Sequence, residues 1–341
     1  MARLYDVRAS GSFDKVSGRA YNLPGMMIYG GIDEAGYGPK LGPLVVSGAL
    51  LRTPGETDLW TLLRDGVSGR DERDGRVVVQ DSKVRHAGRH GLRRLEETVW
   101  PFLRLMGVKP PVTSKELIRV LGEGGEARGT EPWYREGTLT LPLEADAEEL
   151  EALWARLRGG LKKARAEFLG FRCRVIEPID LNRGLKSGLN KADFHAVQVG
   201  GVLSELLSRA GETAARIDVD KLGGRVFYTR PLVEAFPGYG ILTLAEEPGR
   251  SRYRLIKGSA RAEVTFSKGA DRDHCLVALA SCLSKYLREV GMVLLNRYWA
   301  QRVDGLKPTA GYPGDADRFV KAIRTAILDT GVKFDTLVRE R

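Results

Sequence analysis

The chain has 341 residues, of which 43% are hydrophobic and 29% charged, and this composition excludes a wholly disordered or collagen-like protein. Its formal charge of +10 favours a polyanionic partner such as nucleic acid, although solubility alone could explain the excess of Lys and Arg. No apolar run approaches the roughly 18 residues that span a bilayer, and the N-terminal stretch lacks the apolar core of a signal peptide. We therefore expect a soluble, cytoplasmic protein with no membrane partner.

The first elements are expected to be two paired strands. Residues 1–25 show no sustained periodicity and are predicted to be an N-terminal extension ahead of a domain that covers 26–341. Within that domain, apolar runs at 26–32 and 44–51 flank a loop that is dense in Gly and Pro. This arrangement predicts an antiparallel strand pair joined by a shaped turn.

The middle of the chain changes in character. Apolar residues at helical spacing predict a helix at 92–99, and a strand is expected around 102–108. From about 110 to 173 the sequence contains a Gly- and Glu-rich stretch, a short alternating run and a charged helix expected at 146–168. We interpret this block as an inserted unit of helices and strands.

The second half alternates helices with strands. The predicted elements are a helix at 193–210, a strand at 215–219, a helix at 224–239, strands at 253–256 and 263–266, and a long helix at 271–302. Together with the first strands, this order favours an α/β fold in which helices flank a mixed sheet.

Cysteine and histidine residues do not predict a zinc or disulfide site. Three cysteines, Cys173, Cys275 and Cys282, cannot all pair, and buried reduced thiols are the simpler interpretation. The four histidines show no zinc-ligand spacing; His86 and His90 lie four residues apart, but arginines surround them. The remaining metal-binding candidates are carboxylates.

Two adjacent acids end the first predicted strand. Because side chains alternate along a strand, Asp33 and Glu34 are expected to point to opposite faces of the sheet, and by themselves they could be solvated turn residues. The loop that follows changes this expectation. Gly36 and Gly38 permit positive φ and close backbone approach, so the loop could offer its amide groups to a phosphate.

This segment resembles a signature of the type 2 ribonucleases H. It reads Asp-Glu-Ala-Gly-Tyr-Gly-Pro at 33–39 and continues with Gly-Pro and an apolar strand at 42–46. The family's Asp-Ser-Lys motif has its counterpart at 81–83, where Ser82 and Lys83 precede a basic helix. The resemblance covers about residues 28–108 and 175–325, and it implies a ribonuclease H-like mixed sheet.

Two further acids resemble the remaining catalytic positions of the family. Asp220 ends a predicted strand before a small turn, and Asp218 is a rival because it lies on the same face two residues earlier. Asp271 begins a helix with a small-residue face, and Lys285 and Arg288 follow in that helix as basic residues do in the family. Without the resemblance, these acids would be interpreted as turn or cap residues.

The resemblance also implies the chemistry and the substrate contacts. It implies an endonuclease that cleaves the RNA strand of RNA/DNA hybrids, with Asp33, Glu34, Asp220 and Asp271 as catalytic and metal-binding residues. Hard carboxylate oxygens favour Mg²⁺ or Mn²⁺, and two such ions about 4 Å apart suit an in-line phosphodiester displacement. The substrate-binding residues that it implies are Gly36, Tyr37, Gly38, Ser82, Lys83, Lys285, Arg288 and Tyr312.

One position departs from the family pattern. The residue between the two loop glycines is usually basic and helps to recognise a ribonucleotide, whereas here it is Tyr37. Metal-dependent cleavage is expected to tolerate this change better than a preference for RNA. The partner that we expect is an RNA/DNA hybrid or a related duplex. Two alternatives stay open: a related nuclease with another substrate, such as branched or single-stranded nucleic acid, and a non-catalytic nucleic-acid-binding protein on the same fold.

Overall fold

The computed structural model describes residues 25–72, 74–122 and 131–340. Residues 1–24 of the predicted extension and most of the Gly- and Glu-rich stretch lie outside the described residues. Among the helices of the described ranges, none is long and apolar enough to cross a membrane.

A seven-stranded sheet forms the centre of the molecule. Its strands are β1 (Met27–Ala35), β2 (Leu44–Thr53), β7 (Glu167–Ile176), β8 (Ala215–Asp220), β9 (Gly240–Glu246), β10 (Arg250–Lys257) and β11 (Ala260–Ser267). Their spatial order is β7-β2-β1-β8-β11-β10-β9. β1 pairs antiparallel with β2 and parallel with β8, and β8 pairs parallel with β11. The predicted strand pair and the mixed sheet are confirmed.

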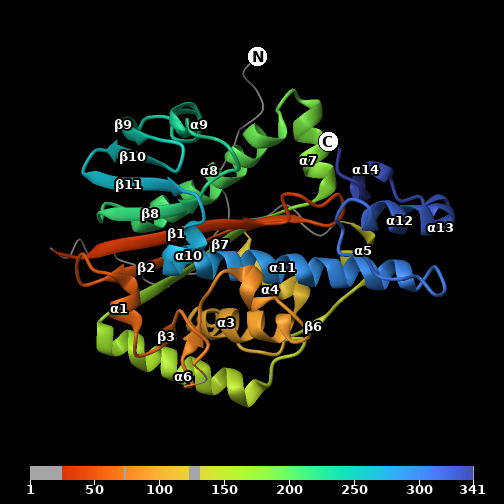
Figure 1. The fold of residues 1–341 in the computed structure, drawn as a ribbon, viewed down its shortest axis with the longest axis horizontal. Coiled ribbons are helices and arrows are strands. Elements are labelled where there is room, and N and C mark those ends of the chain that lie inside the picture. Colours follow the sequence, from red (N-terminus) through yellow and green to blue (C-terminus); the bar gives the residue numbers. More distant parts are fainter. Residues whose placement is uncertain (1–24, 73, 123–130, 341) are drawn as a thin grey trace.

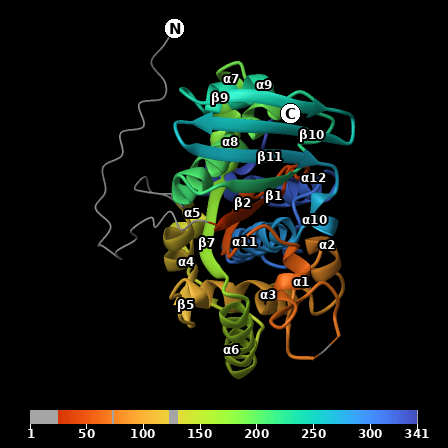
Figure 2. The same cartoon turned by 90° about the vertical axis from the view of Figure 1, so that its left-hand side faces the viewer.

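Helices cover both faces of this sheet (Figure 1). One face carries α7 (Pro178–Lys186), α8 (Lys191–Ala210) and α9 (Thr229–Ala235), and the other carries α10 (Ala270–Asp273) and α11 (Cys275–Ala300). Beyond α11 lies an outer layer with α3 (Gly91–Leu105) and α6 (Ala147–Ala164). Figure 2 shows α11 between the sheet and this outer layer.

The remaining elements are short. They are α1 (Leu59–Leu63), β3 (Val67–Ser68), β4 (Val77–Val78), α2 (Ser82–Arg85), β5 (Val112–Thr113), α4 (Ser114–Leu121), α5 (Pro132–Glu136), β6 (Thr140–Leu141), α12 (Asp315–Ala322), α13 (Arg324–Thr330) and α14 (Phe334–Leu337). The block at 110–166 contributes buried residues to the same core as α11, including Leu117 and Trp133. Its description as an insertion stays a prediction.

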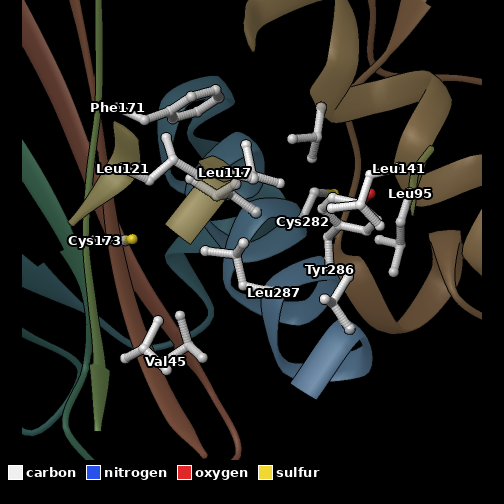
Figure 3. Packing of buried hydrophobic residues seen from close by; sticks show 14 of the residues in the cluster. Val45, Leu95, Leu117, Leu121, Leu141, Phe171, Cys173, Cys282, Tyr286 and Leu287 are labelled. Carbon is white, nitrogen blue, oxygen red and sulfur yellow. The ribbon is translucent and has the colours of Figure 1, made fainter. Parts of the chain in front are cut away.

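Strand alternation divides the core into two clusters. Ile28 and Ile32 of β1 pack with residues of α8, whereas Tyr29 belongs to the cluster around α11. Figure 3 shows the second cluster: Val45 and Cys173 of the sheet lie on one side of α11, and Leu95 of α3 lies on the other. All three cysteines are buried and none forms a disulfide bond, as predicted.

Helix α11 approaches β1 closely because one strand residue lacks a side chain. A Cβ atom at Gly31 would lie 2.2 Å from the backbone of Leu276, so any larger residue would push the helix away from the sheet. This contact fixes the N-terminal end of α11, and with it α10, next to the ends of β1 and β8.

Two predicted boundaries were wrong. Residues 102–105 continue helix α3 rather than forming a strand, because Phe102 and Leu103 extend the buried face that Leu95 and Val99 begin. The charged helix ends at Ala164, and the following residues join the sheet as β7 instead of extending the helix to 168. The periodicity of short apolar runs does not separate a helix end from a strand start.

Of two further predicted helices, one is shorter than expected and the other is interrupted. Only 229–235 of the expected helix at 224–239 is helical. The long helix expected at 271–302 consists of α10 and α11, separated at His274, whose backbone is extended with φ −111° and ψ 115°. The break places Asp271 in α10 and not in α11.

Candidate active site

The parallel pairing of β1 and β8 brings two predicted acids together. Ile32 is the Cα partner of Val219, so Asp33 and Asp220 follow at the same level of the two strands. Ile32 and Val219 face α8, and alternation therefore directs the next residues toward the face that α11 covers. The carboxyl ends of adjacent parallel strands are a common place for a functional site.

Asp33 is buried at the end of β1, on the face of the sheet that α11 covers. Its Oδ1 accepts a hydrogen bond of 2.7 Å from the backbone N–H of Glu34, and Ser284 Oγ of α11 donates to its carbonyl oxygen at 3.1 Å. Burial, followed by repulsion from Glu34 and Asp220, raises the pKa of Asp33 well above its usual range. The negative charge of Asp33 is therefore held in an environment that opposes it.

Glu34 faces the opposite side of the sheet, as strand alternation predicted. Its Oε2 lies 3.7 Å from Nε2 of His195, which is buried in α8. Burial, and then repulsion from Asp220, raises the pKa of Glu34 to about 7. Burial lowers the pKa of His195 to about 4, so this histidine is neutral near pH 7 and does not offset the charge of Glu34.

Asp220 and Asp271 complete the group of four acids. Asp220 Oδ1 accepts a hydrogen bond of 2.9 Å from the N–H of Ala270, which ties the end of β8 to the start of α10. Burial raises the pKa of Asp220. Burial, followed by repulsion from Asp81 and Asp220, raises the pKa of Asp271 to about 6. The structure thus brings the four predicted acids within each other's electrostatic influence.

Asp81 is a fifth acid at this site. Its carboxylate caps α2 by accepting from the N–H of Lys83 at 2.8 Å, and its charge raises the pKa of Asp271. The Asp-Ser-Lys motif was a signal in the sequence, but only Ser82 and Lys83 were assigned a role from it. Ser82 lies at the same place, since Ser281 Oγ of α11 is 2.9 Å from its hydroxyl oxygen.

Asp218, the rival of Asp220, has a different environment. Its Oδ2 lies 3.3 Å from Nδ1 of His274, and this contact raises the pKa of the histidine. Both residues line a neighbouring cavity of about 370 Å³ together with Trp60. Repulsion from Asp220 is among the causes that raise the pKa of Asp33, Glu34 and Asp271.

Lys83 is a predicted substrate-binding residue whose charge acts directly on the acids. Its positive charge lowers the pKa of three of them, Glu34, Asp220 and Asp271. A mobile ammonium group beside carboxylates can also contact a phosphate.

Lys285 and Arg288 of α11 make contacts within the protein. Lys285 Nζ donates to Glu289 at 2.5 Å. Arg288 is buried, its Nη2 donates to the carbonyl of Ala310 at 2.8 Å, and its guanidinium carbon lies 5.8 Å from the ring centre of Tyr312. Tyr312 itself is half-exposed and is available to a ligand.

Tyr37 packs against two residues of α8 that the sequence did not single out. Its ring centre is 5.0 Å from that of His195, and Lys191 Nζ lies 4.7 Å from the centre of the Tyr37 ring. A cation therefore stands beside position 37 even though the residue there is neutral. Local sequence could not show this, because the contact joins a loop to a distant helix.

The two loop glycines differ in their structural requirements. Gly36 has φ +90°, and a Cβ atom there would lie 2.6 Å from the carbonyl oxygen of Pro43 and 2.8 Å from Cδ of Arg288. Gly38 has no positive φ, and a Cβ atom there would meet nothing within 4 Å. The prediction that both glycines permit positive φ and close approach is right for Gly36 and wrong for Gly38.

A matched pair of substitutions tests this difference. Gly36→Ala is expected to lower the free energy of unfolding by about 2 kcal/mol or more, because it combines backbone strain with a steric clash. Gly38→Ala is expected to change it by less than about 0.5 kcal/mol. Urea unfolding followed by circular dichroism measures both values, and equal losses would contradict the assignment.

Among the comparisons with known proteins, only the comparison with solved structures finds matches. No protein-family model matches the chain, and no curated protein sequence matches it. Similar solved structures include the RNase HII of Archaeoglobus fulgidus in a complex with PCNA, with 16% identity and a TM-score of 0.41 over 92% of this chain and 94% of that chain. The ribonuclease H2 of Pyrococcus horikoshii has 14% identity and a TM-score of 0.37 over 91% and 92% of the two chains.

Another similar structure is Bst-RNase HIII in complex with Mn²⁺, with 16% identity and a TM-score of 0.39 over 92% of this chain and 67% of that chain. These solved structures carry the name of the family that the sequence motifs resemble. At such identities and TM-scores, function has to be inferred from the side chains of the site.

Proposed function

We propose that this chain is a divalent-metal-dependent endonuclease of the ribonuclease H type that hydrolyses the RNA strand of RNA/DNA hybrids. One observation supports the proposal: four buried or half-buried carboxylates, Asp33, Glu34, Asp220 and Asp271, lie at the ends of β1 and β8 and in α10, where each feels burial or the charge of a neighbouring acid. The motif resemblance supports the ribonuclease H assignment.

The chemistry of these side chains suits a hard divalent cation. Across the described ranges, no group of three or more His, Cys, Asp or Glu side chains is placed so that it could hold a metal ion. Burial nevertheless raises the pKa of all four acids, repulsion from neighbouring acids adds to it for Asp33, Glu34 and Asp271, and the charge of Lys83 opposes it only in part. Carboxylate oxygens in this condition are the donors that Mg²⁺ and Mn²⁺ prefer, and they would hold such ions.

A bound metal pair would supply an activated water and stabilise the leaving oxygen of the phosphodiester. The residues of the chain have separate tasks. Asp33 and Asp220, on adjacent strands, are held at one level by the sheet, and the bond from Ala270 to Asp220 ties α10, which carries Asp271, to the end of β8. Lys83 provides a positive charge beside the acids and would contact a phosphate oxygen.

Other residues would bind the nucleic acid. The half-exposed Tyr312 offers a ring face to a sugar or base, and the neighbouring Arg288 supports that ring from the protein interior. Lys191 lies over Tyr37 and would supply the positive charge that residue 37 lacks.

A panel of labelled substrates tests the proposal. The full chain is incubated with Mg²⁺ or Mn²⁺ and with an RNA/DNA hybrid, a DNA duplex with one embedded ribonucleotide, a DNA duplex or an RNA duplex. We expect metal-dependent cleavage of the RNA strand of the hybrid, and chelation by EDTA should abolish it. Cleavage confined to DNA would favour the related nuclease, and binding of the hybrid without cleavage would favour the non-catalytic protein.

A further inference from the structure

We propose that Arg339 is a positioning residue for the loop at 36–42 and orients the Gly36–Tyr37 peptide so that the N–H of Tyr37 faces the phosphodiester. The role of that N–H rests on the proposed function. The structural part, that Arg339 holds the loop, can be tested without any activity.

The carbonyl groups of the loop converge on Arg339. Nη1 donates to the carbonyl oxygens of Gly36 and Pro39, the latter at 3.3 Å. Nε and Nη2 both donate to the carbonyl oxygen of Gly42, at 3.1 Å and 2.5 Å. The backbone N–H of Arg339 donates to the carbonyl of Lys40 at 2.9 Å. Arg339 thus donates hydrogen bonds to four carbonyl groups of this seven-residue loop.

These contacts determine where the amide groups of the loop point. In a trans peptide the C=O and N–H bonds are antiparallel, so the carbonyl of Gly36 turned toward Arg339 directs the N–H of Tyr37 the other way. The amides of Lys40 and Leu41 are already used, since both donate to the carbonyl of Gly311. In the part of the chain that the structure describes, the N–H groups of Tyr37 and Gly38 donate to no protein acceptor.

The N–H of Tyr37, turned away from Arg339 and three residues after Glu34, offers a place for a phosphate oxygen. Burial, followed by repulsion from Glu34, raises the pKa of the Tyr37 side chain, and the second cause places residue 37 within the field of the acids. An amide contact of this kind is independent of the side chain at position 37. The structure therefore accounts for a neutral residue at that position.

The segment that carries Arg339 is anchored separately. Asn182 of α7 donates through Nδ2 to the carbonyls of Asp335 and Val338, at 2.9 Å and 2.8 Å. Its Oδ1 accepts from the N–H of Glu340 at 2.7 Å. Asn182 is fully buried, and its three hydrogen bonds hold the backbone on both sides of Arg339. None of these three bonds involves the loop at 36–42.

The guanidinium group suits this position better than a lysine would. Arg339 is 4% exposed, and burial, followed by repulsion from Arg288, lowers its pKa to about 9, while Glu177 opposes that change. The side chain is thus charged at neutral pH, and charged donors form the stronger hydrogen bonds to carbonyl groups. Its planar fork reaches three separate carbonyls, whereas an ammonium group donates from a single nitrogen.

Hydrogen–deuterium exchange of the full chain tests the structural part. In Arg339→Met we expect the exchange rate of peptides covering 36–42 to rise at least about tenfold, because the charged hydrogen bonds are lost. Exchange within β10 should stay as in the wild type. Leu157→Ala is the control, since Leu157 is buried in α6 and its removal lowers stability without touching the loop. An unchanged loop in Arg339→Met would overturn the proposal.

Steady-state cleavage of the hybrid tests the orientation of the amide. We expect Arg339→Met to raise KM by about tenfold to a hundredfold with a smaller change in kcat, because the loop contacts bound substrate. Leu157→Ala at an assay temperature where it is folded should keep the wild-type KM. Arg339→Lys keeps the charge but should recover only part of the loss, and full recovery would contradict the role of the fork.

The two experiments separate the two inferences. A loop that loses protection in Arg339→Met, in a chain that cleaves no nucleic acid, would refute the proposed function and support the role of Arg339 in holding the loop. A wild-type chain that cleaves the hybrid, with the same KM in Arg339→Met, would support the proposed function and overturn the positioning role.

Discussion

Asp33→Asn is expected to lower the rate of metal-dependent hybrid cleavage by at least about 10³-fold. The substitution removes one negative charge from the acids that would hold the metal, and several kcal/mol of transition-state stabilisation depend on such a metal, at about 1.4 kcal/mol for each factor of ten. Asn has nearly the same shape as Asp, so the bond from Glu34 N–H to the Oδ1 position can persist. Single-turnover cleavage with saturating Mg²⁺ or Mn²⁺ measures the loss.

Asp218→Asn provides the matched control for this experiment. Asp218 lies two residues before Asp220 on the same strand face but pairs with His274. We expect Asp220→Asn and Asp271→Asn to lose activity like Asp33→Asn, whereas Asp218→Asn should stay within about tenfold of the wild type. Robust cleavage by Asp33→Asn, or a loss in Asp218→Asn as large as in Asp220→Asn, would refute the site assignment.

The thermal stability of the metal-free protein is expected to fall as the pH rises through the range in which Glu34 loses its proton. Glu34 has an ordinary pKa of 4.5 and a folded-state pKa of about 7. Between these values the folded chain binds more protons than the unfolded chain, so stability decreases with pH and the full penalty is present above pH 7. Asp271, with a pKa of about 6, adds to the effect.

Melting curves with and without divalent metal measure this penalty. At pH 8 without metal we expect Glu34→Gln to melt several degrees above the wild type, since about 1 kcal/mol corresponds to roughly 2 °C in a large domain. At pH 5 the two proteins should melt at similar temperatures. Added Mg²⁺ or Mn²⁺ should raise the wild-type Tm at pH 8 more than that of Glu34→Gln. A wild type that is more stable at pH 8 than at pH 6 without metal would contradict the predicted sign.

The parts of the fold that could be predicted from the sequence are those with a strong local period. The strands that became β1 and β2 and the helix that became α8 were found because apolar residues recur along them at the spacing of their own structure. The strand expected at 102–108 was wrong because this segment has no clear period of its own. Phe102 and Leu103 fit a helix or a strand, and only their contact with the rest of α3 decides between the two.

The candidate site divides in the same way. Asp33, Glu34 and Asp271 could be singled out because they lie in distinctive local motifs. The choice of Asp220 over Asp218 needed the pairing of β8 with β1 and the partner that Asp218 finds in His274.

His195, Lys191 and Arg339 could not have been predicted, because each acts through a residue far away in the sequence. His195 contacts Glu34 on the face of the sheet that α8 covers, and Lys191 lies over Tyr37. In the sequence, Arg339 cannot be distinguished from a solvent-exposed arginine, because its buried partners are known only in the folded chain.

The bond from Arg339 to Gly36 joins residues that are 303 positions apart. A ribosome must have synthesised the chain at least to residue 340, and released that segment from its exit tunnel, before the loop can be held. Contacts of such long sequence separation also form slowly. Nascent chains that already contain all four acids are therefore expected to lack an ordered substrate loop, and a growing polypeptide surrounded by ribosomal and messenger RNA would acquire cleavage competence only after translation has passed this point.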